Sequence, residues 1–160
     1  MKKIELKHTP RPQQIEILDF VKKSISDEHK FMTIDAPTGT GKSYAAVMVA
    51  DWYVNEINKD AKIDVLTNTK LLQDQYTKDF SFMGSLKGSN SYWCKKNLMP
   101  CGESKMLNKL KKTKCTACPH SVAQSRFKSE RISLTNYHLM TAYSLYTPDI
   151  LADRGGNLLI

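Results

Sequence analysis

The sequence predicts an α/β domain with a mainly parallel sheet, because short apolar strands alternate with helices along the chain. A glycine-rich loop between the first predicted strand and the helix after it favours the same fold class, since a loop of this kind joins a strand to a helix in α/β proteins. A segment with all four cysteines lies between the third predicted helix and the third predicted strand, and it is interpreted as an insert.

The first half of the chain predicts five elements in order. Residues 12–25 repeat aliphatic side chains at helical spacing and begin with a proline, which suits the first turn of a helix. Residues 31–34 are a short, partly β-branched apolar run, typical of a buried strand. The alanine-rich residues 44–57 predict a helix, residues 63–66 a second strand, and residues 71–80 a third helix.

The second half is less regular. Residues 84–88 break the pattern with two glycines, and the cysteine segment predicts only one short helix, over 104–110. A strand is expected over 131–135 and a helix over 137–146, which a proline two residues later would end. After a Gly-Gly turn at 155 and 156, residues 158–160 begin a further apolar strand.

The composition of the 160 residues is that of a globular protein, with 41% hydrophobic and 25% charged residues, and this argues against wholesale disorder. No run of about 18 apolar residues is present, so no membrane span is expected. The N-terminus lacks the apolar core of a secretory signal. A cytoplasmic protein is therefore expected, either bacterial or a viral protein in its host cytoplasm.

The net charge of +8 is concentrated in one segment. Residues 87–128 hold ten basic residues and one acidic residue, whereas the rest of the chain holds 14 basic and 15 acidic residues. Because the same segment holds the cysteines, a separate structural unit is predicted there, between residues 1–86 and 129–160. Its basic charge, with aromatic neighbours, favours an anionic partner such as nucleic acid.

Residues 36–43, here called the phosphate loop, fit the Walker A pattern with Ala36 in place of the first glycine. Gly39 and Gly41 would let backbone N–H groups approach phosphate oxygens at a helix N-terminus. Lys42 would reach the β- and γ-phosphates of ATP, and the Ser43 hydroxyl would ligate Mg²⁺. The residues predicted to bind the nucleotide are Thr38, Gly39, Thr40, Gly41, Lys42 and Ser43, of which Lys42 and Ser43 are the catalytic pair.

The cysteines Cys94, Cys101, Cys115 and Cys118 have the spacing C-x6-C-x13-C-x2-C. Four thiolates suit zinc or an iron–sulfur cluster, and neighbouring lysines favour the thiolate form. Only the second pair has the short spacing typical of zinc. The spacing alone therefore leaves zinc, a cluster and no metal all open.

Taken together, the motifs resemble the XPD/DinG-type iron–sulfur DNA helicases of superfamily 2, in matching order from about Arg11 onward. The similar segments are R-P-Q-Q at 11–14, D-A-P-T-G-T-G-K-S at 35–43, T-N-T-K-L-L-Q-D-Q at 67–75, K-G-S-N-S-Y-W-C at 87–94, C-P-H at 118–120 and T-N-Y-H-L at 135–139. The family arginine after K-G is Ser89 here, and one extra residue separates Asn90 from Tyr92.

This resemblance implies a RecA-like motor domain with a small iron–sulfur insert, whose four cysteines hold a 4Fe–4S cluster. It implies ATP-driven 5′→3′ translocation on single-stranded or forked DNA, with Gln14 at the adenine. The residues expected to contact DNA are Thr69, Tyr92, Lys111, Lys112 and Lys114. His120, close to Cys118, is the second candidate as a metal ligand.

The family continues the strand at 158–160 into an Asp-Glu-Ala-His motif, which the sequence lacks. The expectation is therefore an incomplete motor domain, an N-terminal fragment with little or no ATPase of its own. Two alternatives are a non-catalytic nucleic-acid-binding metalloprotein that retains the phosphate loop, and a phosphate-loop ATPase with a zinc-bound insert. The oligomeric state stays open.

Overall fold

The computed structural model describes residues 8–111, 115, 117–152, 154 and 158–160. The chain divides into two compact units, Met1–Asp60 and Ala61–Ile160, which are described separately. None of the helices in the described ranges has both the length and the hydrophobicity that crossing a bilayer requires.

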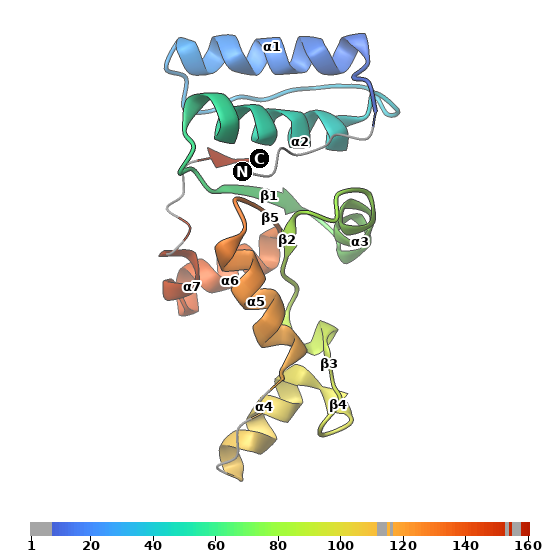
Figure 1. Ribbon diagram of the computed structural model, residues 1–160, viewed down its shortest axis with the longest axis vertical. Helices are drawn as coiled ribbons and strands as arrows, with labels where there is room; N and C mark the ends of the chain where they lie inside the picture. The colour runs from blue at the N-terminus through green and yellow to red at the C-terminus, as the bar shows by residue number, and fades with distance from the viewer. Residues whose placement is uncertain (1–7, 112–114, 116, 153, 155–157) are drawn as a thin grey trace. The chain divides into compact units, whose positions relative to one another are not determined.

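The first unit is helical. It contains α1 (Pro12–Ser26), α2 (Lys42–Trp52) and a π-helical turn, η1 (Tyr53–Ile57), and α1 packs beside α2 (Figure 1). Pro12 stands at the first position of α1, as predicted from its fixed backbone angle. The two helices predicted over 12–25 and 44–57 are confirmed, although the last five residues of the second take the wider π turn.

The strand predicted over residues 31–34 is wrong. The structure gives these residues no strand, and Phe31 is 93% and Ile34 40% exposed. A strand is stable only when a neighbour accepts and donates its ladder hydrogen bonds. The described part of this unit contains helices alone, so the apolar run has no partner strand within it.

The second unit is built on a four-stranded parallel sheet in the order β2-β5-β1-β6. Its strands are β1 (Ile63–Thr67), β2 (Gly84–Ser85), β5 (Ile132–Asn136) and β6 (Leu158–Leu159). The strands predicted over 63–66, 131–135 and 158–160 are therefore confirmed. The glycine break predicted at 84–88 instead begins with the short strand β2, which pairs with β5.

Helices connect these strands, as a parallel sheet requires. They are α3 (Lys70–Asp79), α5 (Pro119–Ser129), α6 (Tyr137–Tyr146) and the short α7 (Asp149–Ala152). The predicted helices over 71–80 and 137–146 are confirmed, whereas α5 and α7 were not predicted. Figure 1 shows α3, α5 and α6 around the sheet, with α5 leading from the sheet to the cysteine segment.

A buried ion pair ties the second unit together. Asp64 lies in the middle of the sheet, and its carboxylate accepts from Nε of Arg154, which is 1% exposed. The guanidinium also donates to the carbonyls of Ile63, Phe127 and Glu130. Burial raises the pKa of Asp64 against the opposing influence of Arg154. A buried guanidinium must have its N–H groups paired, and its partners here lie on β1 and at the C-terminal end of α5. The network therefore joins these two elements.

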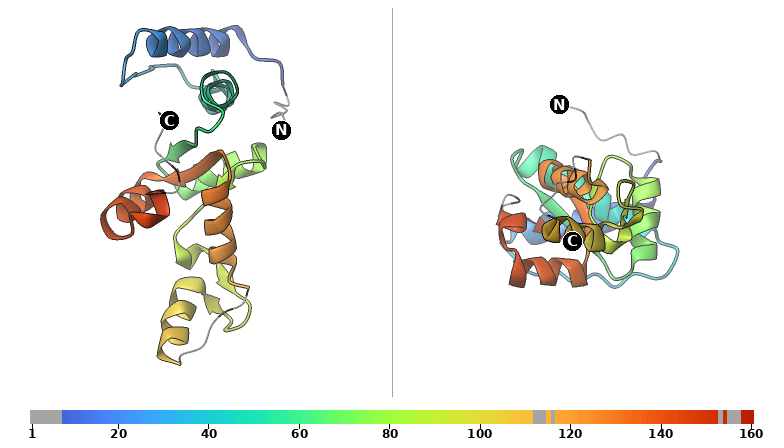
Figure 2. Two further views of the ribbon diagram at one scale, coloured as in Figure 1. Left: turned by 60° about the vertical axis from the view of Figure 1, so that its left-hand side comes forward. Right: turned by 90° about the horizontal axis from the view of Figure 1, so that it is seen from below.

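The cysteine segment forms a small subdomain within the second unit. A 3₁₀ turn, η2 (Ser89–Ser91), leads into an antiparallel hairpin of β3 (Trp93–Cys94) and β4 (Met99–Pro100), and α4 (Cys101–Leu110) follows directly (Figure 2). The short helix predicted over 104–110 is confirmed and starts three residues earlier. The hairpin was not predicted, because two-residue strands are too short to show an alternating pattern.

Candidate nucleotide site, cysteine cluster and basic groove

The phosphate loop takes the backbone shape that its glycines allow. Gly39 and Gly41 have φ angles of 86° and 78°, in the left-handed region that side chains disfavour, and Gly41 is the N-terminal cap of α2. The Lys42 ammonium donates to the carbonyls of Ala36, at 2.8 Å, and Pro37, at 2.9 Å. The Thr40 hydroxyl also donates to Pro37. The loop therefore curls around the lysine that was predicted to reach phosphate.

Gln14 holds this loop from α1. Its Oε1 accepts from the backbone N–H of Arg11, and its Nε2 donates to the carbonyls of Thr40, at 3.1 Å, and Gly41, at 3.4 Å. The side chain is 5% exposed, and a Cβ on Gly41 would lie 2.2 Å from its Nε2. Arg11 adds a hydrogen bond to the carbonyl of Gly39. Gln14 thus holds the loop itself through these hydrogen bonds, in addition to the place at the adenine that the resemblance implies for it.

A hollow of about 250 Å³ opens beside the loop, within the first unit. It is lined by Gln13, Glu16, Ile17, Phe20, Ile34, Asp35, Ala36, Pro37 and Thr40. Thr38 is exposed at the tip of the loop, and Ser43 is partly buried in the first turn of α2. The residues that the sequence predicted to bind the nucleotide therefore lie in the phosphate loop or, in the case of Gln14, against it. The hollow adjoins this loop.

The four cysteines gather at one place in the insert. Cys94, Cys101 and Cys118 are buried together, with Cys115 and Tyr92 packed against them. Side-chain hydrogen bonds link Cys94 with Cys115 and Cys101 with Cys118, and Cys94 also acts electrostatically on Cys101. Within the described ranges, however, no group of three or more His, Cys, Asp or Glu side chains is arranged so that it could hold a metal ion.

Local hydrogen bonds prepare two of these thiols to ionise. The Ser104 side chain and the backbone N–H groups of Asn97 and Lys96 lower the pKa of Cys94. Burial works against ionisation of Cys118, but hydrogen bonds from Ser121 outweigh it and lower the pKa of that thiol. Burial raises the pKa of Cys101. Lowered thiol pKa values favour the thiolate, which is the metal-binding form.

His120 lies beside the cysteines on the first turn of α5. It is 5% exposed, its Nδ1 lies 2.7 Å from Nζ of Lys105, and its ring meets that of Tyr92 edge-on at 5.4 Å. Burial and the neighbouring Lys105 charge lower the pKa of His120 to about 4. The imidazole is therefore neutral at pH 7.

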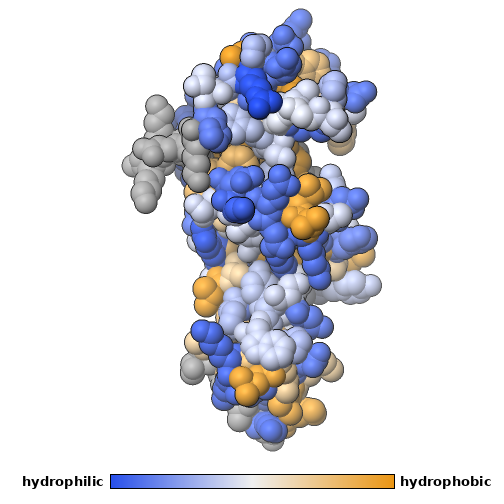
Figure 3. Space-filling model, turned by 90° about the vertical axis from the view of Figure 1, so that its right-hand side faces the viewer, coloured by the Kyte–Doolittle hydropathy of each residue, from blue (hydrophilic) through white to orange (hydrophobic). Residues whose placement is uncertain are grey.

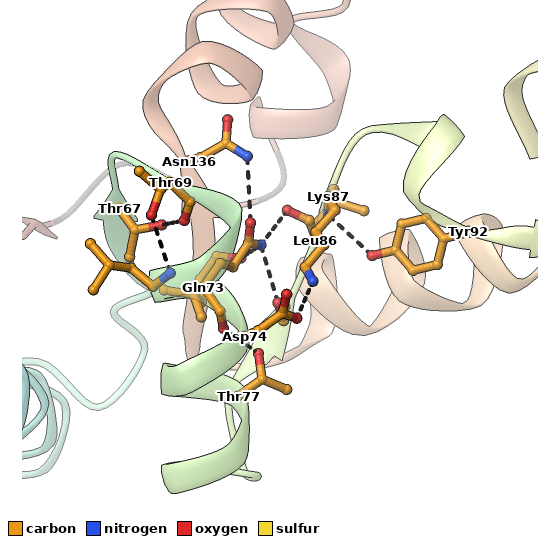
Figure 4. Close-up of polar contacts among 12 residues, drawn as sticks. Thr67, Thr69, Gln73, Asp74, Thr77, Leu86, Lys87, Tyr92 and Asn136 are labelled. Carbon is orange, nitrogen blue, oxygen red and sulfur yellow. Dashed lines mark hydrogen bonds and ion pairs between the residues drawn. The ribbon is translucent and has the colours of Figure 1, made fainter. Parts of the chain in front are cut away.

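A polar network joins α3 to the strand ends and to the insert (Figure 4). Its centre is Gln73, whose fully buried amide donates to the carbonyl of Leu86 at 2.8 Å and accepts from Asn136. Lys87 forms an ion pair with Asp74 of α3, and its backbone N–H donates to the Tyr92 hydroxyl at 3.0 Å. Gln73 was not singled out from the sequence, since a glutamine between Leu72 and Asp74 gives no sign of burial.

A groove of about 640 Å³ runs along this junction, within the second unit. Its lining includes the cations Lys87, Lys95 and Arg126 and the ring of Tyr92, with Asp74 as the one acidic side chain among them. Figure 3 shows hydrophilic and hydrophobic side chains mixed over the lower end of the molecule, where the insert lies. The insert also exposes the apolar residues Leu98 and Met106. The groove therefore combines positive charge with an aromatic wall.

The predicted DNA contacts are distributed around this region. Thr69 is exposed at the N-terminal end of α3, where its hydroxyl accepts from the N–H of Leu72. Lys111 is exposed, whereas Lys112 and Lys114 lie outside the described residues. Tyr92 is partly buried by the contacts above, and its neighbour Trp93 is 58% exposed. Of the two aromatic side chains, Trp93 thus presents the freer ring.

Comparison with known proteins gives a consistent result. Residues 7–153 match the family described as type III restriction enzyme, res subunit. The chain is 41% identical over 71 residues to the 3'-5' exonuclease DinG of Staphylococcus saprophyticus, which is 44% of this chain and 8% of that protein. It is 36% identical over 95 residues to the 3'-5' exonuclease DinG of Staphylococcus epidermidis, 52% of this chain and 10% of that protein. The matches therefore span a tenth or less of these relatives.

Proposed function

The chain belongs to the family of the type III restriction enzyme res subunit. We propose that it is of the DinG type within superfamily 2 and is the ATP-binding part of an ATP-dependent DNA helicase. In this proposal ATP and Mg²⁺ bind at the phosphate loop, and DNA binds along the basic groove. The whole enzyme would couple ATP hydrolysis to 5′→3′ movement along single-stranded or forked DNA.

The phosphate loop carries this proposal. Its two left-handed glycines and the N-terminus of α2 offer N–H groups to phosphate oxygens, as anion sites at helix N-termini do. Bound phosphates would draw the Lys42 ammonium away from the carbonyls of Ala36 and Pro37, because a charged acceptor forms the stronger hydrogen bond. Ser43 would ligate Mg²⁺, and Gln14 would hold the loop in its binding conformation through its hydrogen bonds to Thr40 and Gly41.

The hollow beside the loop favours the proposal that the ligand is a nucleotide and not an inorganic phosphate ion. Its lining combines apolar side chains, such as Ile17 and Phe20, with polar ones, such as Gln13 and Asp35. Such a surface suits a planar base with a polar edge. The base and ribose of ATP would occupy it while the phosphates reach the loop.

The test is calorimetric titration of the chain with ATP and Mg²⁺. Lys42→Ala is expected to weaken binding about 10–100-fold, the range for one or two lost charged hydrogen bonds. Lys30→Ala, an exposed lysine outside the loop, serves as the control and should bind as the wild type does. Equal affinity for the wild type and Lys42→Ala would contradict a nucleotide site at this loop.

A second part of the proposal assigns an iron–sulfur cluster to Cys94, Cys101, Cys115 and Cys118. The donor set fits, because four thiols lie together and two of them have lowered pKa values. Binding would draw the four thiols around the metal group, since the described residues form no ready ligand cage. A bound cluster would supply a rigid, redox-active junction at the base of the hairpin.

DNA is proposed to run along the groove and across the insert. Lys87, Lys95 and Arg126 would neutralise phosphates, and Tyr92 and Trp93 would offer ring faces to bases. The N-terminal end of α3 at Thr69 would hold a backbone phosphate. Lys111 adds exposed positive charge on the insert, and Lys112 and Lys114, which lie outside the described residues, stay in the proposal on the sequence alone. The exonuclease activity in the relatives' names is not proposed for this chain, because the matches cover so little of those proteins.

The domain division follows from the same reasoning. Residues 1–86 and 129–160 are proposed as parts of one RecA-like motor domain, and residues 87–128 as its metal-binding insert. A zinc-bound insert is the alternative that one observation favours, namely the short Cys115-x2-Cys118 spacing. Iron, sulfide and zinc analysis of the same anaerobic preparation separates the two metals.

A further inference from the structure

The side chain of His120 contains a buried nitrogen, Nε2, that forms no hydrogen bond with the residues that the structure describes. The residue is 5% exposed. Buried polar atoms in proteins are nearly always paired, so an unpaired one points to a group that is yet to bind. His120 stands two residues after Cys118, which makes the cysteine cluster the nearest candidate.

Lys105 fixes which nitrogen of His120 carries the proton. A lysine ammonium only donates, so Nδ1 of His120, 2.7 Å from Nζ of Lys105, must accept. A neutral imidazole with an accepting Nδ1 carries its hydrogen at Nε2. The unpaired atom is therefore an N–H donor, and it has no lone pair with which to ligate a metal.

The surroundings of His120 are those of the cysteine cluster. Its backbone N–H donates to the thiols of Cys101 and Cys118. Its ring meets Tyr92 edge-on, and Tyr92 packs against the same buried cysteines. A metal group held by these cysteines would therefore bring sulfur acceptors into the surroundings of the His120 ring.

We infer that His120 is a positioning residue of the metal centre: its Nε2–H donates to a sulfur of the bound group, and Lys105 holds it in the tautomer that can do so. This inference rests on the proposed metal site and goes beyond it. It assigns His120 a different role from the metal ligand that the sequence offered as a second candidate. A hydrogen bond to sulfur stabilises the more negative, reduced state of an iron–sulfur cluster.

The first experiment compares reduction potentials by electron paramagnetic resonance titration of anaerobically purified chains. His120→Phe keeps the ring but removes the donor, so its potential should shift to a more negative value with unchanged iron content. Lys105→Met should shift the potential in the same direction by less. Without the lysine, the proton of His120 can lie on either ring nitrogen, so the Nε2–H donor is kept part of the time. The substitution itself changes only one exposed side chain. Lys109→Met, also exposed on α4, is the matched control for the loss of one positive charge and should shift it least.

A second measurement labels histidine with ¹⁵N and looks for weak coupling between Nε2 and the reduced cluster. Weak coupling that disappears in His120→Phe supports the inference, and strong coupling typical of a directly bound nitrogen overturns it. Unchanged potentials in all three variants, with full iron content, overturn it while the cluster proposal stands.

If the chain binds zinc instead, the cluster proposal fails, and ¹⁵N nuclear magnetic resonance tests the role of His120 separately. An Nε2–H that is protected from solvent exchange only in the zinc-bound form supports donation to a zinc-bound sulfur. An Nδ1–H tautomer or unprotected exchange overturns the inference. A chain that binds neither metal overturns both the metal site and the role of His120.

Discussion

The phosphate loop and the cysteine cluster differ in how far each has the geometry needed to bind its ligand. The loop is built from backbone, and the structure shows its positive φ angles, its helix N-terminus and its lysine in one place. The cysteine cluster is built from side chains, and its thiols are gathered, but the residues that the structure describes form no group arranged to hold a metal ion. Backbone sites are thus prepared by folding, whereas this side-chain site needs its metal to be completed.

The sharpest way to break this comparison is to remove one thiol. Cys118→Ser should lower the affinity for metal by more than the 10–100-fold that is typical when only an outer hydrogen-bond partner of a ligand is lost. ATP affinity should stay unchanged, because no part of the loop involves the cysteines. Metal analysis and calorimetric ATP titration on the same preparation check both halves, and a parallel loss of ATP binding would show that the two sites depend on each other.

The next largest effect is expected in the loop itself. Gly41→Ala places a Cβ at a φ of 78° and against Gln14, so it should cost roughly 1–2 kcal/mol for the left-handed backbone and displace Gln14 as well. Gly39→Ala has a similar φ but open space around its Cβ, which makes it the matched control. Thermal unfolding and ATP titration should show the larger loss for Gly41→Ala, and equal losses would mean that contact with Gln14 does not matter.

A smaller loss is expected for Gln14→Leu. It removes the hydrogen bonds to Arg11, Thr40 and Gly41, each worth about 0.5–1.5 kcal/mol net. ATP affinity should fall several-fold while metal content stays the same. Gln75→Leu, an exposed glutamine in α3, is the control. If Gln14→Leu leaves ATP affinity unchanged, the loop holds its shape without this side chain.

The smallest effect concerns the groove. Lys95→Ala should weaken binding of single-stranded DNA modestly and reduce the slope of log affinity against log salt by about 0.7, the value for one phosphate contact. Lys59→Ala, an exposed lysine outside the basic segment, should leave the slope unchanged. Fluorescence anisotropy at several salt concentrations measures this slope. A salt-independent affinity of the wild type would exclude the groove as the path of DNA.

The sequence was sufficient wherever a pattern depends on local chemistry. Both glycines of the phosphate loop adopt the positive φ that a residue without a side chain allows, and three of the four predicted strands form. The strand over 31–34 failed because an apolar run predicts burial but not the presence of a neighbouring strand. The buried Asp64 within a predicted strand was a usable sign that a charged partner, here Arg154, had to be buried as well.

Side chains whose role depends on tertiary contacts were harder to predict. Gln73 is buried while its neighbours Leu71 and Leu72 are 80% and 41% exposed, the reverse of what hydrophobicity predicts. Its burial follows from hydrogen bonds to segments that are distant in sequence, such as Leu86 and Asn136. The contact between Lys105 and His120 also joins residues that are 15 positions apart. No repeating pattern in the sequence indicates such a contact.

The central claim, that folding completes the phosphate loop but leaves the cysteine cluster to be completed by metal, is tested most directly by metal analysis of the anaerobically purified chain. The account predicts about four iron and four sulfide per chain, with ATP affinity that is unchanged when the metal is removed. A chain that binds no metal, or whose ATP affinity is lost with the metal, would contradict it.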